Sequence, residues 1–357
     1  MTLALTFFYG LVLIIGIGNL VLMRRPKGNA SGPSIAVLIP ARNEAENLPF
    51  ALEPLQKDGT KVYVFDDEST DGTADVARKY GAIVLTPSEP LPQDWTGKNR
   101  GCHALALAAS EDFHGEWVLF LDADTRPTPG MMPALRAMLA EDRGRTRVYS
   151  GMPTLLPAPG SLLENIYLLW VPWILGGTNP FGLVARTRRG HNRFLNGQFV
   201  LWNLRTYMEL MPHEALKGVI LEDVKIGRLL AKNRIHVEIL NLSNILKVLM
   251  YRNFREAYAG MSKNSYEITG SIWGTTLMAL FFFWLALGWI PAAFAGNWLP
   301  LGLFLVGGVV TALSVRRLPL LGLGAPLFTL LAGTTMLNSL LWHRRGAVKW
   351  KDRIYKM

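Results

Sequence analysis

One stretch of the chain constrains its fold more than any other: a five-residue apolar run that ends in two aspartates. Residues Trp117 to Leu121 show no polar alternation, which is typical of a strand buried on both faces in an α/β domain. Ligands of such sheets bind beyond the carboxyl ends of the strands, where Asp122 and Asp124 follow directly. Two carboxylates this close repel each other unless a hard cation or sugar hydroxyls lie between them. The pattern therefore predicts a metal-diphosphate site, with a solvated aspartate turn as the alternative.

The apolar residues are concentrated at the two ends of the chain. Of its 357 residues, 50% are hydrophobic, and the mean hydropathy of +0.21 is high for a wholly soluble protein. Basic residues cluster beside apolar segments, as in Arg24-Arg25 and Arg316-Arg317, so the net charge of +10 favours contact with anionic lipid over binding of nucleic acid. The single cysteine, Cys102, excludes an internal disulfide and is interpreted as a small buried helix residue in a reducing compartment.

An apolar segment at the start of the chain predicts a membrane anchor over residues 1–24. Leu3 to Met23 is almost uncharged and has about the 20 residues that span a bilayer. Basic residues follow this run instead of preceding it, unlike in a cleaved signal peptide. By the positive-inside rule, the segment after the anchor is cytoplasmic.

Three further apolar segments occupy the C-terminal region, residues 271–342. They are Ile272–Ala295, Trp298–Val315 and Leu318–Trp342. If all three spanned the membrane, the basic tail, residues 343–357, would lie outside, against the charge rule. We therefore expect one of the three to be re-entrant or to lie on the surface, without an indication of which one.

Between these segments, residues 34–243 alternate between strand and helix patterns. Strands are expected at Ile35–Ile39, Lys61–Phe65, Ala82–Leu85, Trp117–Leu121 and Arg147–Gly151, and helices at Glu44–Leu55, Cys102–Ser110, Gly130–Leu139 and Val224–Ala231. This order predicts a right-handed, mostly parallel sheet. Charged residues fall in its loops: Asp66-Asp67, Lys98 behind a glycine, and Glu222-Asp223. A solvated lysine and helix capping are the alternatives for Lys98 and Asp223.

Two stretches are interpreted as contacts with the membrane surface. Leu155 to Val184 is rich in leucine and tryptophan, including Trp170 and Trp173, and is interrupted by prolines and glycines. An interfacial helix and a core helix both fit it. Asn244 to Tyr266, within an interface region of residues 244–270, alternates basic and apolar residues and predicts a surface helix that includes Arg255.

The ordered set of Pro40-Ala-Arg-Asn-Glu44, Asp66-Asp67, Lys98, Asp122-Ala-Asp124 and Glu222-Asp223 resembles the family 2 glycosyltransferases over about Ser34 to Asn233. The resemblance implies the nucleotide-sugar-binding α/β fold called GT-A. The frame of apolar segments is most similar to that of the lipid-modifying members, the carotenoid and hopanoid-associated glycosyltransferases and the ceramide glucosyltransferases. A Gln-x-x-Arg-Trp motif of the processive polysaccharide synthases is absent before the C-terminal apolar segments.

The resemblance also implies roles for individual residues. Asp67 would bind the uracil and ribose of the donor beside the loop of Pro40, Ala41, Asn43 and Glu44. Asp122 would meet the ribose, Asp124 a divalent metal (Mg²⁺ or Mn²⁺), and Lys98 the donor phosphates. Asp223 would be the general base. Glu222, Trp170, Trp173 and Arg255 are candidates for the acceptor side.

The function expected from this resemblance is inverting, metal-dependent transfer of a hexose from a UDP-sugar to a membrane lipid. The protein would be a multi-pass protein of the plasma membrane with a cytoplasmic catalytic domain, and nucleic acid is not expected as a partner. Two other functions stay open. One is a processive polysaccharide synthase, and the other is a non-catalytic membrane scaffold that keeps a donor-binding fold.

Overall fold

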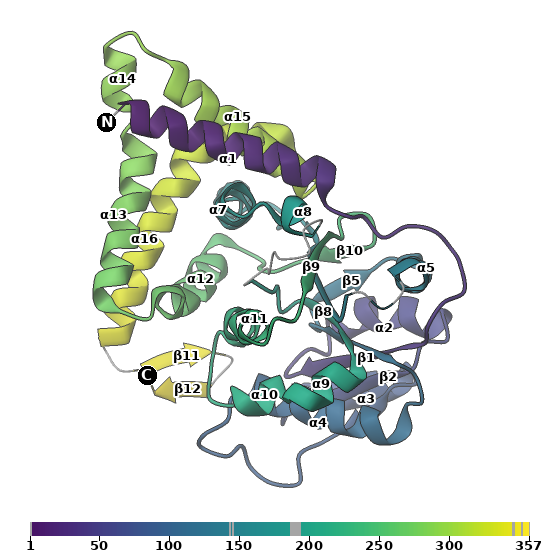
Figure 1. The fold of residues 1–357 in the computed structure, drawn as a ribbon. Coiled ribbons are helices and arrows are strands. Elements are labelled where there is room, and N and C mark those ends of the chain that lie inside the picture. Colours follow the sequence, from purple (N-terminus) through teal and green to yellow (C-terminus); the bar gives the residue numbers. More distant parts are fainter. Residues whose placement is uncertain are drawn as a thin grey trace. The chain divides into compact units, whose positions relative to one another are not determined.

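A computed structural model of the chain (Figure 1) describes residues 2–142, 144, 146–185, 194–344, 347–350 and 353–356. Its residues divide into two compact units. The sheet unit comprises residues 23–154 and 181–249, and the helical unit comprises residues 1–22, 155–180 and 250–357. The domain limits expected from the sequence, such as 34–243 for the catalytic domain, stay a prediction.

A seven-stranded sheet forms the centre of the sheet unit, in the order β3-β2-β1-β4-β8-β6-β9. Its strands are β1 (Ile35–Ala41), β2 (Val62–Asp66), β3 (Ile83–Leu85), β4 (Trp117–Leu121), β6 (Val148–Met152), β8 (Phe199–Asn203) and β9 (Val237–Asn241). Only β8 among them runs antiparallel to its neighbours β4 and β6. The expected mostly parallel sheet is therefore confirmed, together with the α/β fold class.

Helices cover both faces of this sheet because its strands carry apolar side chains in both directions. On β1, Val37 and Ile39 belong to one core cluster and Ala36 and Leu38 to another. The first cluster is closed by helices α2 (Leu48–Lys57), α3 (Thr73–Lys79) and α5 (Met131–Asp142). The second is closed by α4 (Gly97–Asp112), α9 (Leu204–Leu210) and α11 (Glu222–Lys232), and Phe181 of the short α8 (Phe181–Val184) also belongs to it. The short α10 (Pro212–Ala215) lies between α9 and α11 in the chain.

One edge of the sheet gathers the ends of its central strands. Ala41 at the end of β1 is in register with Asp66 at the end of β2, and Leu121 at the end of β4 is in register with Phe199, where the antiparallel β8 begins. The loops after β1, β2 and β4 and the loop before β8 therefore leave the sheet at the same edge.

A small second sheet corrects the interpretation of Asn244 to Tyr266 as one surface helix. In its order β5-β10-β7, the strands are β5 (Thr125–Pro127), β10 (Leu246–Val248) and β7 (Thr154–Leu155). Leu246 and Val248 are buried while Lys247 is exposed, which is the period of two of a strand. The helix begins only at Phe254, as α12 (Phe254–Thr269), capped by the side chain of Asn253.

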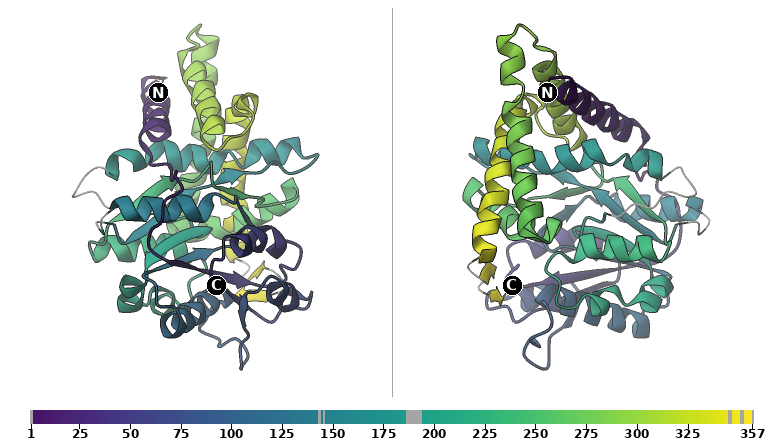
Figure 2. Two further views of the ribbon diagram at one scale, coloured as in Figure 1. Left: turned by 90° about the vertical axis from the view of Figure 1, so that its right-hand side faces the viewer. Right: turned by 60° about the vertical axis from the view of Figure 1, so that its left-hand side comes forward.

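The helical unit has an aromatic core. Its elements are α1 (Thr2–Leu22), α6 (Leu162–Tyr167), α7 (Trp170–Thr178), α12, α13 (Ile272–Leu287), α14 (Ile290–Phe294), α15 (Leu299–Ser314), the 3₁₀ helix η1 (Pro319–Gly324), α16 (Ala325–Arg344) and a hairpin of β11 (Ala347–Trp350) and β12 (Arg353–Lys356). Helices α13 and α16 run side by side, as the right-hand view of Figure 2 shows in green and yellow. Trp170 and Trp173 are buried against Phe282, Phe304 and Phe328, which favours the core-helix alternative for this stretch.

Three helical stretches in the described part of the chain are long and apolar enough to cross a membrane. They are Thr2–Leu22, Ile272–Phe294 and Pro319–Arg344. Helix α15, Leu299–Ser314, is apolar but has only 16 residues. Many of the large apolar side chains exposed on these helices, including Phe7, Trp273 and Phe294, would face lipid in such an arrangement.

Candidate active site

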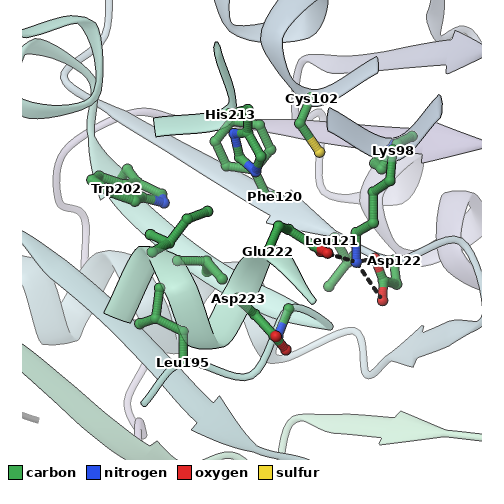
Figure 3. A pocket seen from close by; sticks show the side chains of 14 residues that line it. Lys98, Cys102, Phe120, Leu121, Asp122, Leu195, Trp202, His213, Glu222 and Asp223 are labelled. Atoms are coloured by element: carbon green, nitrogen blue, oxygen red, sulfur yellow. Dashed lines mark hydrogen bonds and ion pairs between the residues drawn. The ribbon is translucent and has the colours of Figure 1, made fainter. Parts of the chain in front are cut away.

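A small pocket opens at the carboxyl edge of the sheet unit (Figure 3). Its walls mix charged and apolar side chains, and it is lined by Pro40, Lys98, Cys102, Phe120, Leu121, Asp122, Leu195, Gly197, Val200, Trp202, His213, Glu222, Asp223 and Ile226. Five of these were candidate site residues from the sequence: Pro40, Lys98, Asp122, Glu222 and Asp223. The sheet topology brings them together, although more than a hundred residues separate the first from the last.

Lys98 lies between two carboxylates that come from different elements. Its Nζ is 3.0 Å from an oxygen of Asp122, after β4, and 3.0 Å from an oxygen of Glu222, at the start of α11. Figure 3 shows both carboxylates pointing toward the ammonium group. Burial disfavours the charged ammonium, but the adjacent Asp122 and Glu222 outweigh this effect and raise the pKa of Lys98 well above its ordinary value. The lysine is therefore a fixed positive charge at neutral pH.

The two carboxylates respond to this lysine in opposite ways. Burial raises the pKa of Asp122 despite the lysine. For Glu222, which is 7% exposed, the attraction of Lys98 overcomes the cost of burial and lowers the pKa. Glu222 is thus an ionised partner of Lys98, and its expected place on the acceptor side stays a prediction.

Asp223 is held by backbone amides. Its Oδ2 accepts a hydrogen bond of 3.1 Å from the amide of Gly197, and its Oδ1 accepts one of 2.8 Å from the amide of Val224. Burial, and next the charge of Glu222, raise the pKa of Asp223 to about 6. A carboxylate with such a pKa is ionised at neutral pH and is basic enough to take a proton. Asp223 lies in the first turn of α11, where the helix dipole favours a carboxylate, but the N-cap position is Leu221 and no side chain caps the helix there.

Gly197 allows the loop before β8 to approach these charges. A Cβ atom at this position would lie 3.2 Å from Nζ of Lys98 and 3.4 Å from Oδ2 of Asp223. Residues 186–193, further back in this loop, lie outside the described residues.

Asp122 and Asp124 are carried by a tight turn after β4. The amide of Asp122 donates to the carbonyl of Gln198 at 3.2 Å, and the amide and hydroxyl of Thr125 both donate to the carbonyl of Asp122, at 3.1 and 2.7 Å. Asp124 is half-buried in this turn but is not among the residues that line the pocket. Within the described ranges, no group of three or more His, Cys, Asp and Glu side chains is arranged to hold a metal.

The donor set nevertheless fits a cation of one particular kind. Mg²⁺ is usually bound through one or two carboxylates and completes its shell with substrate phosphates and water. Asp122 and Asp124 supply two carboxylates at one turn. They suit a cation that arrives with a diphosphate rather than one held permanently in a protein cage.

The loops after β1 and β2 are interlocked. The amide of Asn43 donates to Oγ of Ser69, and the amide of Thr70 donates to Oδ1 of Asn43, both at 2.9 Å. Asn43 and Glu68 adopt left-handed backbone conformations, with φ of +52° and +59°. Non-glycine residues adopt this region only where surrounding contacts hold them, so the two loops form one rigid surface.

Asp67 lies in that surface and is surrounded by arginines. Its carboxylate forms an ion pair with Arg100, and its backbone carbonyl accepts a hydrogen bond of 2.6 Å from Arg42. Asp67 does not line the pocket of Figure 3, but the strand that it follows, β2, is the neighbour of β1. It therefore occupies the same edge of the sheet, two strands from Asp122.

The remaining residues selected for the donor side lie around the end of β1. Pro40 lines the pocket, and Ala41 accepts a hydrogen bond of 2.8 Å from the amide of Asp67 through its carbonyl. The amide of Glu44 donates to Oγ1 of Thr73, and its carboxylate accepts from Nδ2 of Asn47 at 2.7 Å. Glu44 therefore holds the turn into α2.

The candidates Trp170, Trp173 and Arg255 belong to the helical unit. The two tryptophans are buried in its core, and Arg255 is exposed in the first turn of α12. Their roles on the acceptor side stay predictions.

Several residues of the site were not selected from the sequence. His213 is buried, and its Nδ1 is 2.7 Å from the hydroxyl of Tyr207. Burial lowers the pKa of His213 to about 3, so its imidazole is neutral. Asn99 and Arg100 follow Lys98 directly. The only sequence signal for Asn99 and Arg100 was their position beside Lys98, and His213 carried no such signal. Cys102 is a buried helix residue, as expected.

The comparison with protein families supports the class that this fold and site define. Residues 36–157 match the family model described as "Glycosyl transferase family 2". This part of the chain therefore matches the family 2 glycosyltransferases, as the resemblance implied.

Two curated proteins with similar sequences are both glycosyltransferases. A 4,4'-diaponeurosporenoate glycosyltransferase of Staphylococcus haemolyticus is 27% identical over 237 residues, which are 65% of this chain and 60% of that protein. An uncharacterised glycosyltransferase of Mycobacterium tuberculosis is 35% identical over 126 residues, which are 34% of this chain and 53% of that protein. The chain thus spans less than two thirds of the length of the curated relatives it matches. It resembles the carotenoid-associated members of the family.

A solved structure supports the fold. A mannosyltransferase of Pyrobaculum calidifontis, determined in complex with GDP-mannose and Mn²⁺, has a TM-score of 0.51 and 15% sequence identity, and the match covers 95% of this chain and 99% of that one. At this level of identity the likeness shows the fold, which is the GT-A fold expected from the sequence.

Proposed function

We propose that this protein transfers a hexose from a UDP-sugar to an apolar lipid that carries a hydroxyl or carboxyl group. The observation that carries the proposal is the pocket in which Lys98, Asp122, Glu222 and Asp223 meet. It combines a fixed positive charge for a diphosphate with a carboxylate of suitable basicity for an acceptor, at the sheet edge where ligands of α/β folds bind.

The donor would lie along the edge from β2 to β4. Asp67 would bind the uracil and ribose beside the loop from Pro40 to Glu44, while Asp122 would meet the ribose and Lys98 the phosphates. A divalent cation held by Asp124, and reached by Asp122, would neutralise charge on the diphosphate. The Mn²⁺ in the Pyrobaculum enzyme is consistent with that cation, and its GDP-mannose makes a guanine donor the alternative to be tested.

The transfer step would use Asp223 as the general base. It would take the proton of the acceptor hydroxyl while that oxygen attacks the anomeric carbon from the side opposite the leaving group. The bond from that carbon to the diphosphate oxygen breaks, its electrons stay on the diphosphate, and Lys98 stabilises the charge that develops there. Attack from the opposite side inverts the anomeric carbon.

A lipid acceptor is supported by the three helical stretches of spanning length and by the relative named for 4,4'-diaponeurosporenoate. Three spans would also remove the conflict with the charge rule. If α15 does not span, the basic residues after Arg24 and the basic tail from residue 343 both lie on the cytoplasmic side. We therefore infer a multi-pass protein of the plasma membrane with its catalytic domain in the cytoplasm.

The test is a transfer assay with the full-length protein in detergent. It is incubated with UDP- and GDP-sugars and a host lipid extract, and products are weighed by mass spectrometry. We expect one added hexose per lipid with a UDP-sugar and no product from Asp223→Asn when the acceptor carries a hydroxyl. A ladder of products would favour a processive synthase instead, and absence of both transfer and sugar-nucleotide hydrolysis would refute the proposal.

A further inference from the structure

The first turn of α4 directs three consecutive side chains to three different parts of the site. Thr96 caps this helix by accepting a hydrogen bond from the amide of Asn99, which fixes the turn at its start. From this turn, Lys98 reaches the two carboxylates described above. Asn99 and Arg100 reach other loops, and neither has a place in the mechanism so far.

Asn99 is fully buried and holds the segment that leads to the proposed base. Its Nδ2 lies 2.7 Å from the carbonyl oxygen of Leu216, 3.1 Å from that of Lys217 and 3.1 Å from that of Val219. All three partners are acceptors, so the atom that faces them must be the amide nitrogen. The segment ends three residues later at Glu222 and Asp223, which begin α11.

A second contact ties the same segment to the cap of α4. The amide of Thr96 donates to the carbonyl of Lys217 at 2.7 Å. The start of α4 therefore fixes the course of residues 216–219 from two neighbouring positions. Because this segment leads directly into α11, a displacement of it would also move Asp223 relative to an acceptor oxygen.

Arg100 holds the aspartate proposed to bind the donor base. Its guanidinium forms the ion pair with Asp67, donates to the carbonyl of Glu89 at 3.0 Å, and lies over the ring of Phe65 at 5.7 Å from its centroid. The arginine side chain is only 12% exposed. Gly101 allows this close packing, since a Cβ atom there would come within 2.9 Å of the Phe65 ring.

From these contacts we propose that Asn99 and Arg100 are positioning residues with separate tasks. Arg100 sets the orientation of Asp67 and thereby the affinity for the donor nucleotide. Asn99 sets the position of the Glu222-Asp223 pair and thereby the rate of transfer. The proposal rests on the proposed function, because it assigns these tasks to the donor and base sites of that function.

The two tasks predict changes in different quantities: turnover for the Asn99 variants and the dissociation constant for UDP for the Arg100 variants. Binding of UDP is measured by calorimetry, and turnover by UDP release from saturating UDP-glucose with the host lipid extract, both on the full-length protein in detergent. A misplacement of a reacting group by about 1 Å can cost on the order of 100-fold in rate. Loss of one charged hydrogen bond costs about tenfold in binding.

For Asn99, the variants are Asn99→Ala, which removes the donor, and Asn99→Leu, which keeps the size of the side chain. We expect turnover to fall by about tenfold or more while the dissociation constant for UDP stays within about twofold. Asn99→Ser serves if both variants fail to fold, because it is polar but too short to reach the three carbonyls. Asn233→Ala is the matched control, since the exposed Asn233 side chain also donates to a backbone carbonyl, that of Leu229.

For Arg100, the variants are Arg100→Met and Arg100→Lys. We expect the dissociation constant for UDP to rise by about tenfold in the first and to recover in part in the second, with turnover at saturation within about twofold of the wild type. Arg78→Met is the control, because Arg78 forms an exposed ion pair with Asp75 outside the site.

The possible outcomes distinguish failure of the proposed function from failure of the positioning tasks. If the wild type neither binds UDP nor releases it from UDP-glucose, the proposed function is refuted and the positioning tasks with it. If the wild type does both, then folded Asn99 variants with normal turnover, Arg100 variants with normal affinity, or an exchange of the two effects would overturn the positioning proposal alone.

Discussion

The charge of Glu222 offers a direct test of Asp223 as the base. Burial and Glu222 raise the pKa of Asp223 from 3.8 to about 6, which corresponds to about 3 kcal/mol against its ionised form. Only the ionised form can accept a proton, so turnover should be constant above this pKa and fall about tenfold for each pH unit below it. The acid limb of the wild-type profile is therefore expected near pH 6.

Glu222→Gln removes one of the two causes of the raised pKa and leaves Lys98 in place. The pKa of Asp223 should fall for two reasons. The repulsion from Glu222 is lost, and the positive charge of Lys98, no longer partly neutralised by Glu222, attracts the Asp223 carboxylate more strongly. We expect the acid limb to move down by roughly one pH unit. Turnover at pH 5.5 should then fall less in the variant than in the wild type, relative to its own value at pH 7.5.

The assay is UDP release from UDP-glucose between pH 4.5 and 8.5 in buffers of constant ionic strength. Glu209→Gln is the control, because Glu209 is an exposed glutamate on α9, away from the pocket. An acid limb that stays in place in Glu222→Gln, or moves to higher pH, would refute the assignment of that limb to Asp223. A wild type without any acid limb near pH 6 would do the same.

Three further results are expected. Removal of divalent cations with a chelator should abolish UDP release, Mn²⁺ or Mg²⁺ should restore it, and Asp124→Asn should need far more cation; full activity in the chelator would exclude the metal. Gly197→Ala places a Cβ 3.4 Å from Asp223 and should lower turnover about tenfold while thermal unfolding changes little, so unchanged turnover would show that this approach is not needed. Arg136→Ala breaks a two-bond ion pair with Asp58, at 2.7 and 2.9 Å, and should lower the free energy of unfolding by about 1–2 kcal/mol. Because the pKa of Asp58 is lowered in the fold, this deficit should be present above its ordinary 3.8 and shrink as the pH falls through the lowered value, in unfolding curves measured at several pH values.

The sheet and its loop chemistry were predictable because they follow from local rules. The unbroken apolar run of β4 identified a buried strand, and buried parallel strands have only one edge at which their carboxyl ends can meet. This rule places Asp122 at the ligand edge, whereas the roles of Lys98 and Asp223 at the same site were implied by the resemblance to the family 2 glycosyltransferases; all three line the pocket. The fold class is confirmed on the same basis, and residues 36–157 match the family model that the motifs implied.

Features that depend on pairing between distant segments could not be predicted in this way. The strand at Leu246 to Val248 is only three residues long and is stabilised by pairing with β5. The sequence does not show this pairing, and its alternation of basic and apolar residues therefore predicts a helix instead. The contacts of Asn99 and Arg100 were missed for the same reason. Their partners are backbone carbonyls and a loop aspartate that the sequence does not mark as neighbours.

The interlocked loops after β1 and β2 matter for any attempt to engineer nucleotide choice. Asn43 has a left-handed backbone and is hydrogen-bonded to both Ser69 and Thr70, so the two loops share one set of contacts. Grafting one loop from a guanine-using enzyme would leave its partner without a matching surface. A chimera that redirects the base preference must exchange both segments in a single step.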